Sequence, residues 1–386
     1  MAEILNKNEL DGTFVGRVWR PDVQGPAVVA LRGDDIVDIT SRQAPTVAAL
    51  LELDDPAAAA RDTPGERLGS LDEVASRSAE PDHGGDAPWL LAPCDLQVVK
   101  ACGVTFARSM LERVIEEMAD GEFAKAQQAR ERVVAIIGDS LRDVRPGSEE
   151  AARIKEALLA EDMWSQYLEV GIGPDAEVFT KSPVMSAVGY GAAIGLLPAS
   201  QWNNPEPEIV LAVNSRGQVN GVTLGNDVNL RDLEGRSALL LGKSKDNNAS
   251  CAVGPFLRLF DQTYSIDDVR QAEIDLEVTG RDGFRLLGHS SMKEISRDPL
   301  DLVAQTIGRH HQYPDGFVLF LGTMFAPVED RDVPGEGFTH KLGDVVDIST
   351  DGLGTLRNTV QLSTECPEWD FGITALMRNL AARELL

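Results

Sequence analysis

From Val170 onward the sequence is a series of short hydrophobic runs, broken by Gly, Pro or Asn about every ten residues. The runs "EIVLAV", "GQVNGVTLG", "EIDLEVTG" and "DGFVLFLGT" have the length and the content of branched and aromatic residues that strands prefer. This spacing predicts a mainly antiparallel sheet or barrel with few helices. The clearest helices are expected at "SALLLGK" and "DPLDLVAQTIG".

The first 90 residues have a different texture. Residues 13–39 alternate short β-rich runs with Pro and Gly turns, and "TVAALLELDD" then indicates a short helix. Residues 53–88 are rich in Ala, Asp, Glu, Gly and Pro, which is typical of a mobile connector. We therefore expect residues 1–90 to form a small N-terminal α/β domain closed by an acidic connector, and residues 91–386 to form the main domain.

A heavily charged helical pattern occupies the start of the main domain. Between Ser109 and Leu168 almost every segment has helical periodicity. Two solvated helices would explain the pattern, but a helical insertion between two strands is also what a lid over a site looks like. The expected fold class is α+β, mainly β, with a helical lid at about 107–168.

The charge of the chain limits its partners. It carries 62 acidic against 36 basic residues, a net charge of −26 at pH 7. Such a surface repels nucleic acid and anionic lipid over about one Debye length, so neither is an expected partner. An anionic substrate would need a local positive site, made by a metal or by a few Arg and Lys side chains.

Other sequence signals indicate a cytoplasmic setting. The N-terminus lacks a basic region followed by an apolar run, and no apolar stretch approaches the roughly 18 residues of a membrane span. Four cysteines, Cys94, Cys102, Cys251 and Cys366, show no C-x-x-C pair or zinc-ligand spacing. We expect a soluble, cytoplasmic protein with reduced, mostly buried cysteines.

Carboxylate side chains are the remaining candidates for a functional site once the common catalytic and nucleotide-binding motifs are excluded. The chain has no H-E-x-x-H and no G-x-S-x-G, and the glycines of "VGYGAAIG" fit neither a P-loop nor a dinucleotide fingerprint. In "PEPEIVLAV" the two-residue period of a strand places Glu206 and Glu208 on one face, and "GNDVNLRD" places Asp227 at the end of the next run. Such carboxylates would repel one another unless a hard cation lay among them, and Mg²⁺ prefers oxygen ligands. Alone, the pattern is a weak signal and is also compatible with a wet strand edge.

Basic residues follow these carboxylates in the sequence. Lys181 lies in "EVFTK", Arg231 follows Asp227 in "GNDVNLRD", and Lys245 lies in "KDNNASC". Each alone is most often a solvated surface charge. Beside a carboxylate triad they suit the carboxylate of an anionic substrate.

Six ordered motifs give the chain a family resemblance. "GVTFARSMLE", "EVFTKSP", "NPEPEIVLAV", "GNDVNLRDLEGR", "KDNNASCAVGPF" and "FLGT" together resemble the fumarylacetoacetate hydrolase family from about residue 97 to the C-terminus. The resemblance implies a mixed β-roll core that binds Mg²⁺, or Mn²⁺ in its place, through Glu206, Glu208 and Asp227. It also implies a homodimer or homotetramer, with a structural or dimer-forming role for the first 90 residues.

The resemblance also implies the kind of substrate. Members of the family bind a small anionic 2-keto acid, which chelates the metal. In this chain Arg231, Lys181, Lys245 and Thr323 of "FLGT" are the residues expected to help hold it.

One motif departs from the hydrolase pattern. Family members that hydrolyse carbon–carbon bonds carry Asn-Tyr-x-x-His-x-x-Glu in the lid, where this chain has "TFARSMLE". Ser109 therefore stands in the His position, while Glu112 keeps the Glu. A serine hydroxyl cannot replace imidazole as a base at neutral pH, so the departure disfavours hydrolysis.

The chain is more similar to the 2-keto-3-deoxy-D-arabinonate dehydratase branch of the family. That branch places an acid–base Glu in the "EVFTK" strand, which is Glu177 here. Bound metal would acidify the C3 proton of the substrate, Glu177 or a water it holds would remove that proton, and Glu112 or a lid water would assist loss of the C4 hydroxyl. Ser109 and Lys245 complete the expected catalytic set.

The main expectation is thus a Mg²⁺-dependent dehydratase that converts a 2-keto-3-deoxy pentonate to 2,5-dioxopentanoate in a non-phosphorylative pentose route. Two alternatives stay open. One is an acylpyruvate or 2,4-diketo acid hydrolase of the same family, and the other is a metal- or ligand-binding relative without catalysis.

Overall fold

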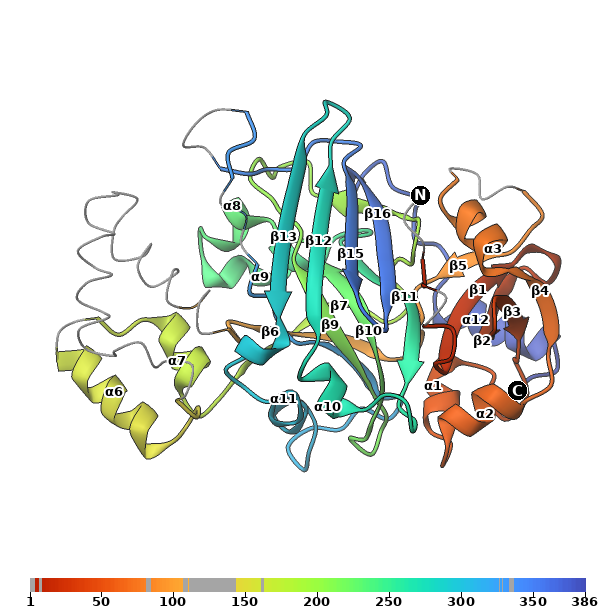
Figure 1. Ribbon diagram of the computed structural model, residues 1–386, viewed down its shortest axis with the longest axis horizontal. Helices are drawn as coiled ribbons and strands as arrows, with labels where there is room; N and C mark the ends of the chain where they lie inside the picture. The colour runs from red at the N-terminus through yellow and green to blue at the C-terminus, as the bar shows by residue number, and fades with distance from the viewer. Residues whose placement is uncertain are drawn as a thin grey trace.

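Two packed β-sheets form the body of the computed structural model (Figure 1). The structure describes residues 4–6, 9–80, 85–106, 110, 144–160, 163–325, 327, 329–332 and 337–386. The larger sheet has the strand order β4 (Glu66–Ser70), β3 (Asp35–Asp38), β2 (Gly25–Arg32), β1 (Phe14–Arg20), β11 (Cys251–Leu259), β10 (Val219–Asp227), β9 (Pro207–Val213), β14 (Phe317–Phe320), β6 (Val98–Gly103) and β7 (Glu177–Ser182), and β5 (Trp89–Leu91) pairs with β1. The smaller sheet has the order β13 (Arg285–Ser291), β12 (Glu273–Thr279), β15 (Val345–Thr350), β16 (Gly354–Leu362) and β8 (Ala193–Leu196).

Short helices surround the sheets. The α-helices are α1 (Val47–Leu51), α2 (Pro56–Asp62), α3 (Leu71–Ser78), α6 (Glu149–Ala160), α7 (Gln166–Ile172), α8 (Arg231–Glu234), α9 (Leu241–Lys245), α10 (Ile266–Val269), α11 (Pro299–Thr306) and α12 (Ile373–Ala382). The 3-10 helices are η1 (Pro21–Val23), η2 (Ala238–Leu240) and η3 (Met292–Glu294). Most strand pairs are antiparallel, with β14–β6 and β16–β8 parallel. The mainly β, α+β fold class is confirmed.

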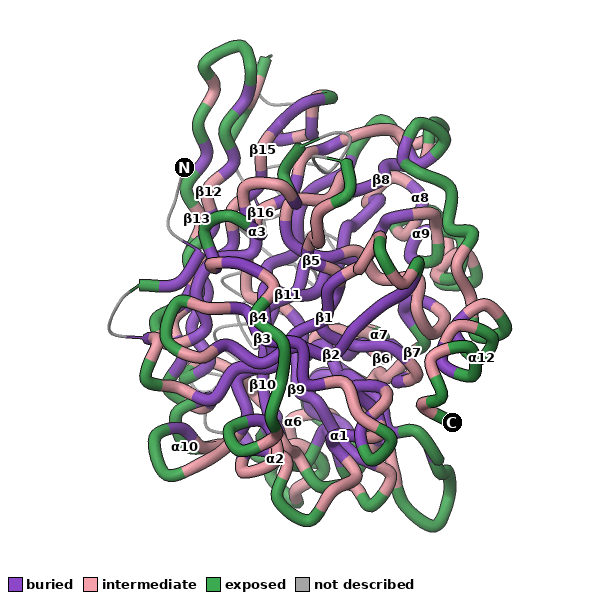
Figure 2. Tube along the Cα trace, turned by 90° about the vertical axis from the view of Figure 1, so that its right-hand side faces the viewer, coloured by how far each residue is buried: buried purple, intermediate pink, exposed green. Residues whose placement is uncertain are grey.

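The larger sheet is covered on both faces, which explains why its central strands are hydrophobic throughout. Every residue of β9 and of β11 is buried (Figure 2). Along β9, Ile209 and Leu211 pack in one core with side chains of β12, β15 and β16, whereas Val210 and Ala212 pack in a second core with α1 and α2. This double burial fixes the register of β9, because a slip of one residue would exchange the two faces.

The stretch expected to be a connector is folded instead. It contains α2, β4 and α3, and only the composition suggested a mobile segment. Asp55 caps α2 at its N-terminus with Pro56 in the first turn, and Ser70 and Glu73 form a capping box on α3. Alanines of α2 pack into the second core, so this Ala-rich segment is a short buried helix.

The N-terminal strands β1 to β4 belong to the larger sheet, together with strands of the main domain. Strand β1 pairs with β11, with Phe14 opposite Arg258. These strands lie at the opposite end of the molecule from α6 and α7, which follow β6 and precede β7 in the chain (Figure 1). Within the described ranges, every helix is too short or too polar to cross a membrane. All four cysteines are buried and unpaired, as predicted.

A polar clamp joins α1 to the turn between β9 and β10. The Glu52 carboxylate accepts hydrogen bonds from Ser215 N (2.6 Å), Ser215 Oγ (2.9 Å) and Arg216 Nη1 (2.8 Å). The side-chain amides of Asn214 and Asn220 donate to Leu51 O, at 3.3 and 2.6 Å. The clamp therefore holds the far end of the hairpin that carries the acidic residues described below.

We expect Glu52→Ala to lower the free energy of unfolding by about 1–2 kcal/mol, because it removes three hydrogen bonds to a partly buried carboxylate. Thermal or denaturant unfolding would measure this loss. Glu368→Ala, at an exposed position, is the matched control. Equal stability of the two variants would show that the Glu52 carboxylate contributes nothing to the clamp.

Candidate active site

Three carboxylates converge where β9 begins and β10 ends. The antiparallel pairing of these strands places Asp227 beside Glu206, and Asp227 N donates to Glu206 O (3.1 Å). Glu206 and Glu208, two residues apart, point to the same side as Asp227. Oxygen atoms of all three carboxylates lie within 4.8 Å of one another, and all three residues are buried. The structure thus brings together the three residues that the sequence singled out.

Two lysines neutralise part of this negative charge. Lys245 Nζ lies 3.0 Å from Glu206 Oε2 and 3.1 Å from Asp227 Oδ2, and Lys181 Nζ lies 2.9 Å from Asp227 Oδ1. Burial alone would raise the pKa of Asp227, but the two ammonium groups outweigh it and hold that pKa below its usual value. Burial likewise lowers the pKa of Lys245, but the carboxylates around it outweigh the burial and raise that pKa well above its usual value. Both Asp227 and Lys245 are therefore charged.

Glu208 has a different environment. Its Oε2 accepts a hydrogen bond from Gly322 N (2.6 Å), and the structure gives it no lysine at ion-pair distance among the described residues. Burial raises the pKa of Glu208 well above its ordinary value, and the nearby charges of Asp227 and Glu206 raise it further. A positive ion among the three carboxylates would relieve this repulsion. Buried, converging carboxylate oxygens are the donor set of a hard divalent cation, so the residues present fit Mg²⁺.

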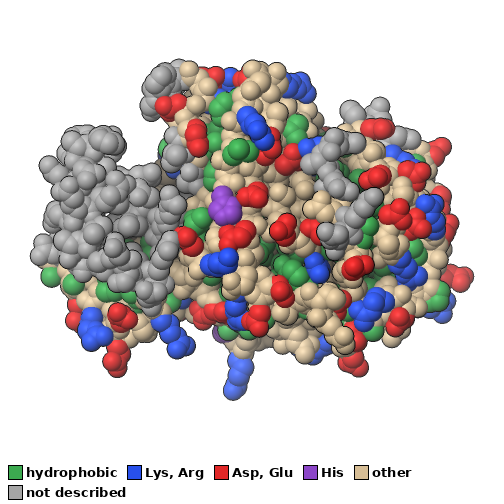
Figure 3. Space-filling view, in the orientation of Figure 1, with side chains coloured by type: hydrophobic (Ala, Val, Ile, Leu, Met, Phe, Trp, Pro, Cys, Tyr) green, Lys and Arg blue, Asp and Glu red, His purple; other side chains and the backbone are tan. Residues whose placement is uncertain are grey.

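A cavity of about 600 Å³ lies beside the carboxylates. Its wall includes the carboxylate triad together with Glu177, Arg231, Lys245 and Thr323. The face of the molecule drawn in Figure 3 carries many acidic side chains with basic ones scattered among them, and the whole chain has a net charge of −26. An anionic ligand must therefore depend on the cations inside the cavity.

Lys181 does not line the cavity, although the sequence suggested that it contacts the substrate. Its side chain is completely buried, and its ammonium also donates to Lys245 O (2.6 Å). Glu177, Phe179 and Lys181 share one face of β7. Glu177 and Phe179 line the cavity, but the strand continues past it, so Lys181 reaches Asp227 from behind. In this structure Lys181 supports the charge of Asp227.

Ser109 and Glu112, expected in the catalytic set, lie outside the described residues, as does most of the segment 107–168. The structure describes α6 within that segment and α7 at its end and just beyond it, and their buried residues Leu158, Leu168 and Ile172 pack with Met110 in a small core of their own. Tyr167 and Val170 of α7 line the cavity. The lid itself stays a prediction.

The Glu177 carboxylate depends on a glycine in the neighbouring strand. Gly103 in β6 pairs with Glu177 in β7, and a Cβ atom at Gly103 would lie only 1.9 Å from Glu177 Oε2. Any larger residue at position 103 would displace the carboxylate. Cys102, the residue before Gly103, also lines the cavity, but burial and the charges of Glu208 and Glu177 raise the pKa of its thiol, which disfavours the thiolate.

The cavity wall also holds residues that the sequence reasoning missed. Asn229 donates from Nδ2 to Glu206 Oε1 (2.8 Å), and Asn204 lies opposite Asn229 at the start of the hairpin. Both could have been found, because they are two residues from Asp227 and Glu206 on the same strand faces. Arg236 and His289 also line the cavity. His289 comes from the smaller sheet, and hydrogen bonds to Asp275 and Glu273 raise its pKa despite partial burial.

The chain is similar in sequence to one protein family and to two named dehydratases. Residues 173–361 match the family model described as "Fumarylacetoacetate (FAA) hydrolase C-terminal". The chain is 30% identical over 211 residues to a protein of Haloferax volcanii named "Probable 2-keto-3-deoxyxylonate dehydratase". The matched residues cover 55% of this chain and 68% of that protein. It is 32% identical over 188 residues to the "2-dehydro-3-deoxy-D-arabinonate dehydratase" of Saccharolobus solfataricus. Those residues cover 48% of this chain and 58% of that protein.

A solved structure shares the fold. The structure described as "2-keto-3-deoxy-D-arabinonate dehydratase complexed with magnesium and 2,5-dioxopentanoate" superposes with a TM-score of 0.62 at 22% identity. The superposition covers 90% of this chain and 99% of that one. At this identity the likeness concerns the fold alone.

Proposed function

This chain belongs to the fumarylacetoacetate hydrolase family, and from that premise we propose that it is a carbon–oxygen lyase, a Mg²⁺-dependent dehydratase that converts a 2-keto-3-deoxy pentonate to 2,5-dioxopentanoate. The observation that carries the proposal is the buried triad of Glu206, Glu208 and Asp227 in the wall of a cavity that also holds Glu177 and Arg231. The names of the related dehydratases support the same reaction.

Glu206, Glu208 and Asp227 are the residues that would hold Mg²⁺, or Mn²⁺ in its place. When bound there, the ion supplies positive charge that draws electrons from the C2 carbonyl of the substrate and makes the C3 proton easier to remove. Lys245 and Lys181 keep Asp227 ionised, which preserves the charge of that ligand.

Arg231, Lys245 and Thr323 line the cavity and would orient the substrate. A guanidinium presents paired N–H donors that match a carboxylate, so Arg231 suits the C1 carboxylate of a 2-keto acid. Thr323 Oγ1 accepts from Phe325 N (3.1 Å), which directs its hydroxyl proton to another acceptor, such as a substrate oxygen.

The proton steps need one base and one acid. Glu177 accepts the proton from C3, and the C4–O bond breaks as the hydroxyl receives a proton and leaves as water. The C5 alcohol carbon and its oxygen then each lose a hydrogen while C3 and C4 each gain one, which gives the aldehyde without further oxidation or reduction. Glu112 or a water supplies the proton to the leaving hydroxyl. Ser109 belongs to the same sequence motif as Glu112 and completes the proposed catalytic set.

Further parts of the proposal rest on the resemblance to the family. We place the reaction in a non-phosphorylative breakdown of pentoses and the protein in a homodimer or homotetramer. Four buried, unpaired cysteines are compatible with a reducing, cytoplasmic setting.

The decisive assay offers both C4 enantiomers of 2-keto-3-deoxy pentonate and an acylpyruvate to the purified protein, with Mg²⁺ or with EDTA. We expect one enantiomer to lose a single water by mass spectrometry, with activity abolished by EDTA and restored by Mg²⁺. Cleavage of the acylpyruvate without dehydration would favour the hydrolase alternative. Mg²⁺ binding without any turnover would favour the non-catalytic one.

A further inference from the structure

Arg231 of the cavity wall is stacked on a tryptophan that lies outside the cavity. The guanidinium carbon of Arg231 lies 4.3 Å from the centre of the Trp202 ring. Trp202 is 41% exposed. We propose that Trp202 is a positioning residue of the substrate site, which holds the guanidinium of Arg231 in the orientation that binds the substrate carboxylate. This inference rests on the proposed function.

Stacking suits this role because of the shape of the guanidinium. Its flat face packs on an aromatic ring, while its N–H donors point outward in the plane and stay available for hydrogen bonds. An arginine side chain has several rotatable bonds, and ordering them costs conformational entropy when a ligand binds. A ring that orders the guanidinium beforehand removes part of that cost.

The segment that carries Trp202 is fixed to α8, the helix that begins with Arg231. Asp232 accepts hydrogen bonds from Ser200 Oγ (2.7 Å) and Gln201 N (2.8 Å). Asp232 N donates to Trp202 O (3.3 Å). The backbones on either side of the stacked pair are thus tied directly to each other.

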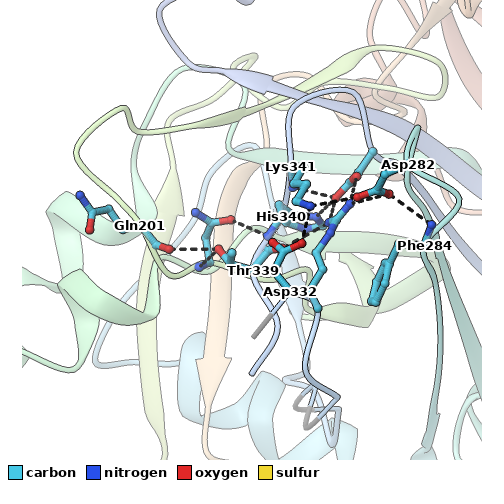
Figure 4. A network of polar contacts seen from close by, with 10 residues as sticks. Gln201, Asp282, Phe284, Asp332, Thr339, His340 and Lys341 are labelled. Carbon is cyan, nitrogen blue, oxygen red and sulfur yellow. Dashed lines mark hydrogen bonds and ion pairs between the residues drawn. The ribbon is translucent and has the colours of Figure 1, made fainter. Parts of the chain in front are cut away.

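A second network, formed by residues near Thr339 and His340, fixes the same segment (Figure 4). Thr339 Oγ1 donates to Gln201 O (3.2 Å) and accepts from Asn203 N (3.3 Å), and His340 N donates to Asn203 Oδ1 (3.3 Å). The side chain of Arg331, which is 1% exposed, holds Thr339 in place, since it donates to Thr339 O (3.2 Å) and pairs with Asp344.

Residues before and after Trp202 therefore have fixed partners in α8 and in the segment of Thr339 and His340. Its exposed indole belongs to an ordered segment. Among the described residues, the indole contacts the charged group of Arg231. The two networks fix the backbone on both sides of this contact.

The test measures binding of pyruvate, the simplest 2-keto acid, by calorimetry in the presence of Mg²⁺. We expect Trp202→Ala to weaken binding by about three- to tenfold, and Trp202→Phe to restore it to within about twofold. Trp202→Leu, which keeps apolar bulk without an aromatic face, should behave like Trp202→Ala and replaces it if that variant does not fold. Trp369→Ala, at a similarly exposed tryptophan, should bind normally.

A double-mutant cycle separates positioning from a general structural role. In an Arg231→Ala background, Trp202→Ala should cause no further loss of pyruvate binding. With the sugar acid as substrate, KM should rise about as much as the pyruvate Kd while kcat stays within about twofold.

Two outcomes would overturn the inference in distinguishable ways. Equal weakening by Trp202→Ala in both backgrounds, or a fall in kcat at unchanged KM, would reject the role of Trp202 and leave the dehydratase proposal intact. A wild-type protein that neither binds pyruvate with Mg²⁺ nor dehydrates the sugar acid would reject the proposed function, and the inference with it.

Discussion

Glu177→Gln should lower kcat for dehydration by about 10²–10⁴-fold, the usual contribution of a positioned general base. Glutamine has nearly the same shape as glutamate but cannot accept the C3 proton. Because the substitution leaves the triad and Arg231 untouched, binding of Mg²⁺ and pyruvate should be nearly unchanged. Initial rates of water loss from the sugar acid, with calorimetry for binding, would measure both.

Gly103→Ala provides an independent route to the same conclusion. The added methyl would overlap Glu177 Oε2, so the carboxylate must move and kcat should fall although Glu177 is still present. Gly372→Ala, where nothing lies within 4 Å of an added Cβ, is the matched control. Normal kcat in Glu177→Gln would remove Glu177 from proton transfer, whatever the result at position 103.

Asp227→Asn and Glu208→Gln should both weaken Mg²⁺ binding by more than about tenfold, since each removes one ligand charge. Their effects on the metal-free protein should differ. Asp227→Asn leaves the completely buried ammonium of Lys181 without its carboxylate, which should lower the free energy of unfolding by about 3–5 kcal/mol. Glu208→Gln should cause no such loss, because it relieves repulsion from Asp227 and Glu206 and keeps an oxygen that accepts from Gly322 N.

Calorimetric titration with Mg²⁺ and thermal unfolding in EDTA would measure these two properties for each variant. Undiminished Mg²⁺ binding in either variant would place the metal elsewhere. Equal destabilisation of both would contradict the unequal distribution of the lysines around the triad.

The sequence predicted the strands and the pair Glu206 and Glu208 well because these depend on local patterns, and Asp227 followed because β9 and β10 are consecutive strands. The continuous hydrophobic run of β9 and the Gly, Pro and Asn turns were visible without any long-range information. The two-residue period of a strand brought Glu206 and Glu208 together, and it extends to Asn204 and Asn229. The folded connector was missed because loops and short capped helices share Ala, Asp and Pro, although Ser70 and Glu73 carried a capping signal.

The parts that could not be predicted depend on which strands pair. His289 reaches the cavity from the smaller sheet, and Gly103 makes room for Glu177 only because β6 and β7 are neighbours. The burial of Lys181 depends on where β7 ends relative to Asp227. A single sequence contains no record of these pairings, so neither the glycine nor the buried lysine could be interpreted correctly.

The pairing of β1 with β11 also has a consequence for how the chain is made. Phe14 faces Arg258, so β1 leaves the ribosome long before the strand beside which it must lie. At a synthesis rate of about 5–20 residues per second, this delay is on the order of 10 s or more. During that interval β1 and β2 have one sheet edge without its final neighbour, and such edges promote aggregation. Chaperone dependence of the newly made protein should therefore be greatest before residue 259 has emerged.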